Sequence, residues 1–167
     1  MKAKIIKAFV RYIAAQILCL FVNIMLAALG HGIVRALCLV CTAAVLVCAM
    51  ADLGIKEAAA DLKRERISGE RVPFAEMICA AAAVTLLPAV NRIVLLVSAL
   101  GGGFEFYGIF KLLEPSFLQL YNYIEPSACA SDLSAAELAA VMPAAAVPAL
   151  ALLISYTAAR KNNNGKR

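Results

Sequence analysis

The chain lacks the residue patterns that carry catalysis or hold a metal ion. It contains one histidine, His31, and no H-E-x-x-H, G-x-S-x-G or phosphate-loop motif occurs along it. It has no internal repeat either. These absences exclude the common zinc, serine-hydrolase and nucleotide-binding sites. We therefore expect no catalytic centre, no metal site and no cofactor.

Charged residues are also scarce. They make up 16% of the 167 residues, against 63% hydrophobic residues, and the mean hydropathy is +0.85. Such a composition lies far outside the average of soluble proteins. Because a membrane-spanning helix needs about 20 apolar residues, the chain has room for four spans but not for a separate soluble domain. The net charge of +5 belongs to residues that flank the apolar stretches, so we expect no nucleic-acid binding.

The lysines and arginines are present in three short clusters, which hold 13 of the 16. The clusters are Lys2, Lys4, Lys7 and Arg11; Lys56, Lys63, Arg64, Arg66 and Arg71; and Arg160, Lys161, Lys166 and Arg167. Only Arg35, Arg92 and Lys111 lie elsewhere. Basic residues of membrane proteins gather in the cytoplasmic loops. The clusters therefore predict a multi-pass protein of the cell membrane with a cytoplasmic N-terminus and C-terminus.

We predict an all-α integral membrane protein, a four-transmembrane-helix bundle that forms one domain over residues 1–161. The expected spans are about 9–29, 33–53, 74–100 and 135–159, with a cytoplasmic loop at 54–73 and an outer loop at 101–134. A tight turn at 30–32 joins the first two spans, and the basic tail 162–167 should be disordered. The apolar stretch 9–29 is longer than that of a typical signal peptide, which favours an uncleaved first span.

Local signals mark two helix boundaries. Acids and bases alternate at helical spacing after residue 52, so the second helix should continue beyond its span to Ser68. Ser134 and Glu137 form an S-x-x-E capping box, which predicts the start of the last span.

The stretch 74–115 allows two topologies. It is too long for one span and is interrupted by Pro88, by Asn91 with Arg92, and by the glycines 101–103. One crossing gives four spans, with 13 basic residues inside and 3 outside. A hairpin at Asn91 and Arg92 would give a fifth span, with 10 basic residues inside and 6 outside. The distribution of basic residues favours four spans.

An aromatic-rich segment follows this stretch and contains seven of the twelve aromatic residues. They are Phe104, Phe106, Tyr107, Phe110, Phe117, Tyr121 and Tyr123. Aromatic side chains are enriched at the membrane interface. Since Pro115 and Pro126 divide the segment, we predict one or two short amphipathic helices that form a cap on the outer surface between spans three and four.

Polar residues at membrane depth form a candidate site besides the aromatic cap. Tyr12, Gln16, Cys19 and Asn23 share one face of the first helix, because they are spaced at i, i+4, i+7 and i+11. Such a face should turn inward, where it would either hydrogen-bond to another span or line a cavity. Asn91 and Arg92 allow two readings: Arg92 reaches the far interface and extends to it, or the helix continues to residue 100 and both residues need polar partners.

Three prolines lie at membrane depth, namely Pro88, Pro143 and Pro148. Each removes a backbone donor and frees a carbonyl group. We predict helix kinks at these positions, although broken helices also occur at transporter sites.

Cys38 and Cys41 form a C-x-x-C pair at the outer end of the second span. This layout resembles that of the four-span disulfide-generating quinone reductases of the DsbB type, which implies a thiol-disulfide exchange at this pair. That family needs a second cysteine pair in the outer loop, where this chain has Cys129 alone. The alternative is that the cysteines are small packing residues of an apolar helix.

These observations predict a small membrane protein without a catalytic site that acts as an accessory or interaction subunit. Its expected partners are the lipid bilayer and a second protein or further copies of itself, and the aromatic cap is the expected contact surface. One alternative is a transporter or channel protomer that works as an oligomer. The second alternative is a membrane thiol-disulfide oxidoreductase that uses Cys38 and Cys41.

Overall fold

The computed structural model describes residues 2–27, 32–101 and 104–164, and these residues form helices without a strand. The helices, in chain order, are α1 (Lys2–Ala27), α2 (Gly32–Ser68), α3 (Ala75–Ala99), α4 (Tyr107–Leu113), the 3-10 turn η1 (Pro115–Phe117), α5 (Leu118–Ile124), the 3-10 turn η2 (Ala130–Asp132), α6 (Ala135–Val141), the 3-10 turn η3 (Met142–Ala146) and α7 (Val147–Asn164).

Four helical segments are long and apolar enough to cross a membrane, as the sequence predicts. They are Lys2–Leu26, Gly32–Ser68, Ala75–Ala99 and Ala135–Asn163. The last of these consists of α6, η3 and α7 in succession. Large apolar side chains such as Ile17, Phe21, Val40 and Leu86 are exposed on the outside of the bundle. This combination indicates a multi-pass membrane protein.

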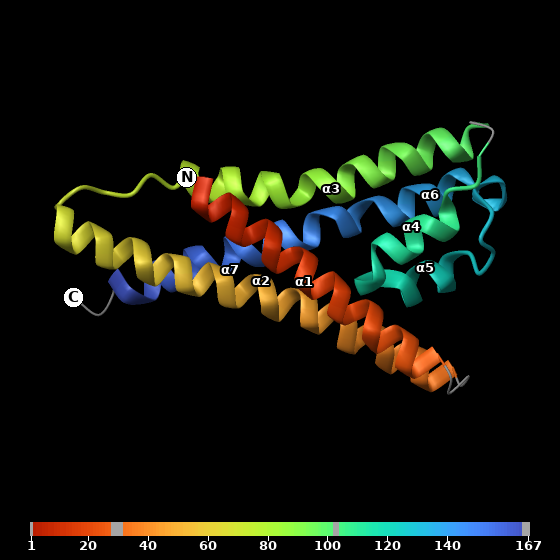
Figure 1. Ribbon diagram of the computed structural model, residues 1–167, viewed down its shortest axis with the longest axis horizontal. Coiled ribbons are helices and arrows are strands. Elements are labelled where there is room, and N and C mark those ends of the chain that lie inside the picture. Colours follow the sequence, from red (N-terminus) through yellow and green to blue (C-terminus); the bar gives the residue numbers. More distant parts are fainter. Residues whose placement is uncertain (1, 28–31, 102–103, 165–167) are drawn as a thin grey trace.

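The helices diverge toward one end of the molecule. At the end where α1 begins and α2 and α7 finish, which we call the basic end, the helices lie together (Figure 1). At the opposite end, α1 and α2 separate from α3 and α6 (Figure 1). The two short helices α4 and α5, with η1 between them, lie between these two pairs of helices (Figure 1). We call residues 107–124 the hairpin, and this end of the molecule the hairpin end.

The third helix decides between four and five candidate spans. Asn91 and Arg92 lie inside α3, which is continuous from Ala75 to Ala99. The turn that a fifth span requires at these residues is therefore absent. α4 has seven residues, which is too short for a crossing. Gly101, which follows α3, has a φ of 98° and so adopts a conformation that favours glycine.

The ends of the other helices follow local signals. α2 continues to Ser68, as predicted, and ends at Gly69 with a φ of 73°, whose N–H donates to the carbonyl of Glu65 at 3.0 Å. The predicted capping box is present, because the Ser134 hydroxyl accepts from the N–H of Glu137 and the Glu137 carboxylate accepts from the N–H of Ser134. α7 includes residues 162–164, for which the sequence predicts disorder. The predicted turn at 30–32 lies outside the described residues except for Gly32.

The most extensive helix contact, between α2 and α7, depends on a glycine. A Cβ atom at Gly54 would lie 2.1 Å from the Ser155 hydroxyl and 2.6 Å from the carbonyl oxygen of Leu152. The hydroxyl can rotate away, but the carbonyl belongs to the backbone of α7. The close approach of the two helices therefore requires a residue without a side chain at position 54.

We predict that Gly54→Ala lowers the thermal stability of the purified protein in detergent, because α7 has to move away from α2. The expected cost is about 1–3 kcal/mol, typical of an overpacked core. Gly32→Ala is the matched control, since a Cβ atom at Gly32 has no neighbour within 4 Å. Equal melting temperatures for the two variants would contradict this packing.

Candidate functional site

The tip of the hairpin is held by the polar face of α1. The Ser116 hydroxyl donates to the side-chain oxygen of Gln16 at 2.7 Å, and the Ser116 N–H donates to the same atom at 3.3 Å. The Asn23 amide donates to the carbonyl of Pro115 at 2.8 Å. All four residues are buried. Gln16 and Asn23 thus face inward in the bundle, and both bind the hairpin.

The second helix completes this contact from the other side. The Thr42 hydroxyl donates to the carbonyl of Ser116 at 3.0 Å, and the Gln119 amide donates to the side-chain oxygen of Asn23 at 3.0 Å. Cys19, the third member of the predicted stripe, lies within 3.3 Å of the carbonyl of Thr42. The chain reversal at the tip breaks the helical hydrogen-bond pattern, so its backbone groups need partners from other elements. α1 and α2 supply them.

The contact lies far from either end of α1. Gln16 is 14 residues from Lys2 and 11 residues from Ala27. At 1.5 Å per residue, the tip of the hairpin meets α1 about 21 Å from one end and about 16 Å from the other. The hairpin therefore extends from the hairpin end to the middle of the bundle.

A buried ion pair joins the hairpin to α3. Arg92 and Glu114 lie 2.5 Å apart, and their side chains are 4% and 3% exposed. The Tyr121 hydroxyl donates to the second oxygen of the Glu114 carboxylate at 2.8 Å. Tyr121 also accepts a hydrogen bond from Arg92 at 3.2 Å, so the three side chains form a closed network.

The remaining donors of Arg92 bind backbone carbonyls. It donates to the carbonyl of Pro88 in α3 at 3.0 Å and to that of Val141 in α6 at 3.3 Å. Its guanidinium group lies 5.6 Å from the centre of the Phe110 ring. A guanidinium group has five donors in a fixed plane. Arg92 uses them to link α3, α6 and both halves of the hairpin.

This network corrects the first of the two readings of Arg92. Arg92 does not extend away from the bundle, because α3 continues past it to Ala99 and the side chain is buried. The second reading holds, since the residue has the polar partners that a buried charge requires. Asn91 is also buried, with 7% of its surface exposed.

The aromatic segment is folded into the bundle. Tyr107, Phe110, Phe117 and Tyr121 are buried, whereas Phe104 and Tyr123 are exposed and Phe106 is partly exposed. Phe110 packs on Tyr121 across the hairpin with 5.0 Å between ring centres. Two short helices are present, as predicted, but most of the aromatic side chains face inward. The Arg92 network, α1 and α2 determine which side of each short helix faces inward. A sequence pattern does not reveal these partners.

Two cavities border the hairpin. One, of about 240 Å³, lies between the hairpin and the ends of α1 and α2, and we call it the Arg35 cavity. It is lined by Leu20, Asn23, Ile24, Leu26, Val34, Arg35, Cys38, Leu112, Leu118, Gln119 and Asn122. The other, of about 230 Å³, lies between α1, α3 and the hairpin, and its lining includes Tyr12, Gln16, Asn91 and Pro115. Residues of the polar stripe thus reach both cavities.

Comparison with protein-family models, with curated proteins and with solved structures finds no match to this chain. The hairpin and its partners therefore carry the functional interpretation by themselves.

The six cysteines are free thiols. Cys38 is buried and lies 3.3 Å from the side-chain oxygen of Asn23, so it belongs to the polar contact at the hairpin tip. Cys41 is exposed on the outside of α2. Among the described residues, no group of three or more histidine, cysteine, aspartate or glutamate side chains is placed to hold a metal ion.

The prolines have different effects. Pro88 lies within α3 and does not end it. Pro143 belongs to the 3-10 turn η3, and Pro148 is the second residue of α7. The last candidate span is therefore interrupted near the level of Arg92, which donates to the carbonyl of Val141 just before η3.

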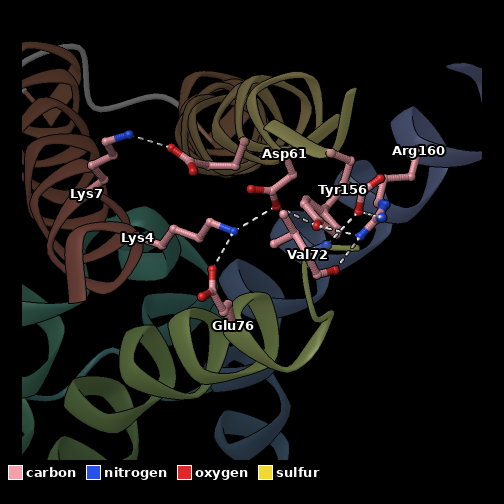
Figure 2. A network of polar contacts seen from close by, with 9 residues as sticks. Lys4, Lys7, Asp61, Val72, Glu76, Tyr156 and Arg160 are labelled. Carbon is pink, nitrogen blue, oxygen red and sulfur yellow. Dashed lines mark hydrogen bonds and ion pairs between the residues drawn. The ribbon is translucent and has the colours of Figure 1, made fainter. Parts of the chain in front are cut away.

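The basic end contains a second polar network, in which basic residues of α1 and α7 pair with acids of α2 and α3 (Figure 2). Lys4 bridges Asp61 and Glu76 at 2.7 and 3.0 Å, and Lys7 pairs with Glu57 at 2.8 Å. Asp61 also accepts a hydrogen bond from the Tyr156 hydroxyl at 2.7 Å. Arg11 and Arg160 pair with Asp52 and Glu65, respectively. These pairs join α1, α2, α3 and α7 where the helices lie closest together (Figure 1).

Several residues of the site do not stand out in the sequence. They are Thr42, Glu114, Ser116 and Gln119, each of which is buried and has a partner on another element. The spacing of Glu114, Ser116 and Gln119 around Pro115 was the available signal. Polar side chains on both sides of a proline in an apolar chain indicate a backbone reversal that needs partners.

We predict that Arg92→Gln destabilises the purified protein by about 3–5 kcal/mol, because it leaves the buried carboxylate of Glu114 without its cation. The double variant Arg92→Gln/Glu114→Gln should be less destabilised, since it removes both charges. Thermal unfolding in detergent measures both. Arg66→Gln, at an exposed position of α2, is the control. A single variant as stable as the control would show that the ion pair does not hold the hairpin.

Proposed function

We propose that the protein spans the cell membrane four times, with both termini in the cytoplasm, and works as a transport protomer. Four apolar helical segments support this topology, and so does the gathering of the described residues of the basic clusters at one end of the bundle. The basic end would then face the cytoplasm. The hairpin would enter the membrane from the outer face and return to it.

The depth of the hairpin tip is the observation that carries this proposal. A hydrocarbon core is about 30 Å thick, so a tip about 16 Å along α1 would lie near its middle. Backbone outside a regular helix is tolerated at that depth only where protein buries it or where it lines a water-filled cavity. Broken helices that meet at mid-membrane are typical of the substrate sites of transporters.

The two cavities supply the space for a path. The Arg35 cavity contains Asn23 and Gln119, and the second cavity contains Gln16 and Asn91. The hairpin tip lies between them, because Ser116 binds Gln16 while Pro115 binds Asn23. A solute that moved from one cavity to the other would have to displace the tip. A bundle of this size would complete such a path by association with further copies.

The Arg92–Glu114 pair would hold the hairpin in place. It is the described ion pair that fixes the hairpin to a long helix, and Tyr121 binds both of its members. Ionisable residues inside a membrane are rare and commonly mark transport pathways. A transport cycle would require that this pair opens when the hairpin moves.

The other two functions stay predictions, and the geometry favours them less. The accessory role depended on an aromatic surface, and four of the seven aromatic side chains are buried. The thiol-exchange role depended on a pair of accessible thiols, and Cys38 is 1% exposed.

Labelling with a water-soluble thiol reagent tests the transport proposal. All six cysteines are replaced by alanine, and single cysteines are then introduced as Gln16→Cys and Gln119→Cys. We expect both to react in intact cells or inverted vesicles, because a transport path must admit water on each side of the tip. Ile17→Cys is the control. Ile17 follows Gln16 in α1 but is exposed on the outside of the bundle, so its cysteine should lie in the lipid and stay unlabelled.

Cys129 is the control for sidedness, because it is exposed and lies in the predicted outer loop. A variant that keeps Cys129 alone should react from outside the cell. If Cys129 reacts and neither interior cysteine does from either side, the interior is dry and the transport proposal is wrong.

A further inference from the structure

The Arg35 cavity has a charge that the fold does not use. Arg35 has no ion-pair or hydrogen-bond partner among the described residues, and it is exposed. The two other basic residues of this half of the molecule are occupied. Arg92 pairs with Glu114, and Lys111 donates to the carbonyls of Glu125 and Ser127 at 2.8 and 2.7 Å. Arg35 therefore remains available to a ligand.

Unused amide groups line the same cavity. Gln119 is 8% exposed and donates one of its two amide N–H groups to Asn23 at 3.0 Å, and the second has no acceptor among the described residues. Asn122, one turn further along α5, makes no side-chain hydrogen bond within the described part of the chain. The cavity thus presents one guanidinium group and two amides.

No acid among the described residues that line the cavity balances this charge. Neither aspartate nor glutamate is among its lining residues. A guanidinium group binds phosphate and carboxylate oxygens through two parallel hydrogen bonds. Amide nitrogens can donate to further oxygens of the same anion. The polar part of the cavity therefore fits a phosphate group, which offers more acceptor oxygens than a carboxylate.

The rest of the lining is apolar and comes from four helices, with Val34 and Cys38 contributed by α2. Leu20 and Ile24 belong to α1, Leu112 belongs to α4 and Leu118 belongs to α5. Ile24 and Leu112 are exposed on the outside of the molecule, so the wall of the cavity continues onto the face that lipid would cover. A free phosphate ion would gain nothing from contact with this apolar surface, because it has no apolar part to bury. A hydrocarbon chain would bury apolar surface against it.

We propose that the Arg35 cavity binds the phosphate headgroup of an anionic membrane lipid. Arg35 pairs with the phosphate, Gln119 and Asn122 bind the headgroup, and the first part of an acyl chain lies between α1 and the hairpin. The inference rests on the proposed transport function, because it names the class of molecule that the hairpin-end cavity takes. The same site would deliver the headgroup to Asn23, which binds the hairpin tip.

Lipid binding to the purified, delipidated full-length protein tests this proposal. Native mass spectrometry in detergent gives apparent dissociation constants for three probes: dioleoyl phosphatidic acid, dioleoyl phosphatidylcholine and inorganic phosphate. We expect phosphatidic acid to bind at least about tenfold more tightly than either of the others. Equal binding of phosphatidic acid and phosphatidylcholine would contradict an anion site. Equal binding of inorganic phosphate would contradict a lipid site.

Two variants locate the site. Arg35→Gln and Asn122→Leu should each weaken the binding of phosphatidic acid, the former by about tenfold or more, because each removes a group that faces the cavity. Arg66→Gln is the matched control, with the same change of charge at the basic end, and should bind like the unaltered protein. If both cavity variants bind phosphatidic acid as tightly as the control, the cavity is not the lipid site.

Thermal unfolding of each variant verifies that it is folded. Lipid binding is measured at equilibrium in detergent and does not depend on a path through the bundle. If positions 16 and 119 react with the water-soluble thiol reagent but the protein does not bind phosphatidic acid, the transport proposal stands and the lipid proposal is wrong. If the protein binds phosphatidic acid through Arg35 but neither position reacts, the lipid proposal stands and the transport proposal is wrong.

Discussion

The structure depends on the need to give hydrogen-bond partners to a chain reversal in the middle of an apolar bundle. The tip of the hairpin leaves backbone groups of Pro115 and Ser116 without helical partners, and an unpaired buried group is costly. Gln16, Asn23 and Thr42 satisfy these groups from two different helices. Their positions on α1 and α2 therefore determine how far the hairpin enters the bundle.

The divergence of the helices follows from this constraint. α1 and α2 separate from α3 and α6 at the hairpin end because the hairpin occupies the space between them (Figure 1). The opposite end closes the bundle, where Gly54 allows α2 and α7 to approach and ion pairs such as Lys4 with Asp61 join the helices (Figure 2). Arg92 holds the hairpin on the side of α3 and α6. The bundle is thus tied at one end by ion pairs and divided at the other by the hairpin.

Much of this fold follows from sequence patterns that act locally. The four apolar stretches, the capping box at Ser134 and the end of α2 at Ser68 depend on neighbouring residues, and each is present where the sequence predicts it. The inward face of α1 could also be predicted, because Gln16 and Asn23 avoid lipid. The partner of that face could not. Ser116 is 100 residues from Gln16, and a polar stripe says nothing about which distant segment satisfies it.

Cross-linking between α1 and the hairpin tip in native membranes tests the central claim most directly. In the cysteine-free background, Gln16→Cys combined with Ser116→Cys should be joined by a short bifunctional thiol reagent, because these side chains are in contact. Ile17→Cys combined with Ser116→Cys should not be joined, since Ile17 faces outward from the next position of the same helix. Equal cross-linking of the two pairs, or none in either, would contradict a hairpin that enters the bundle and binds α1 at its middle.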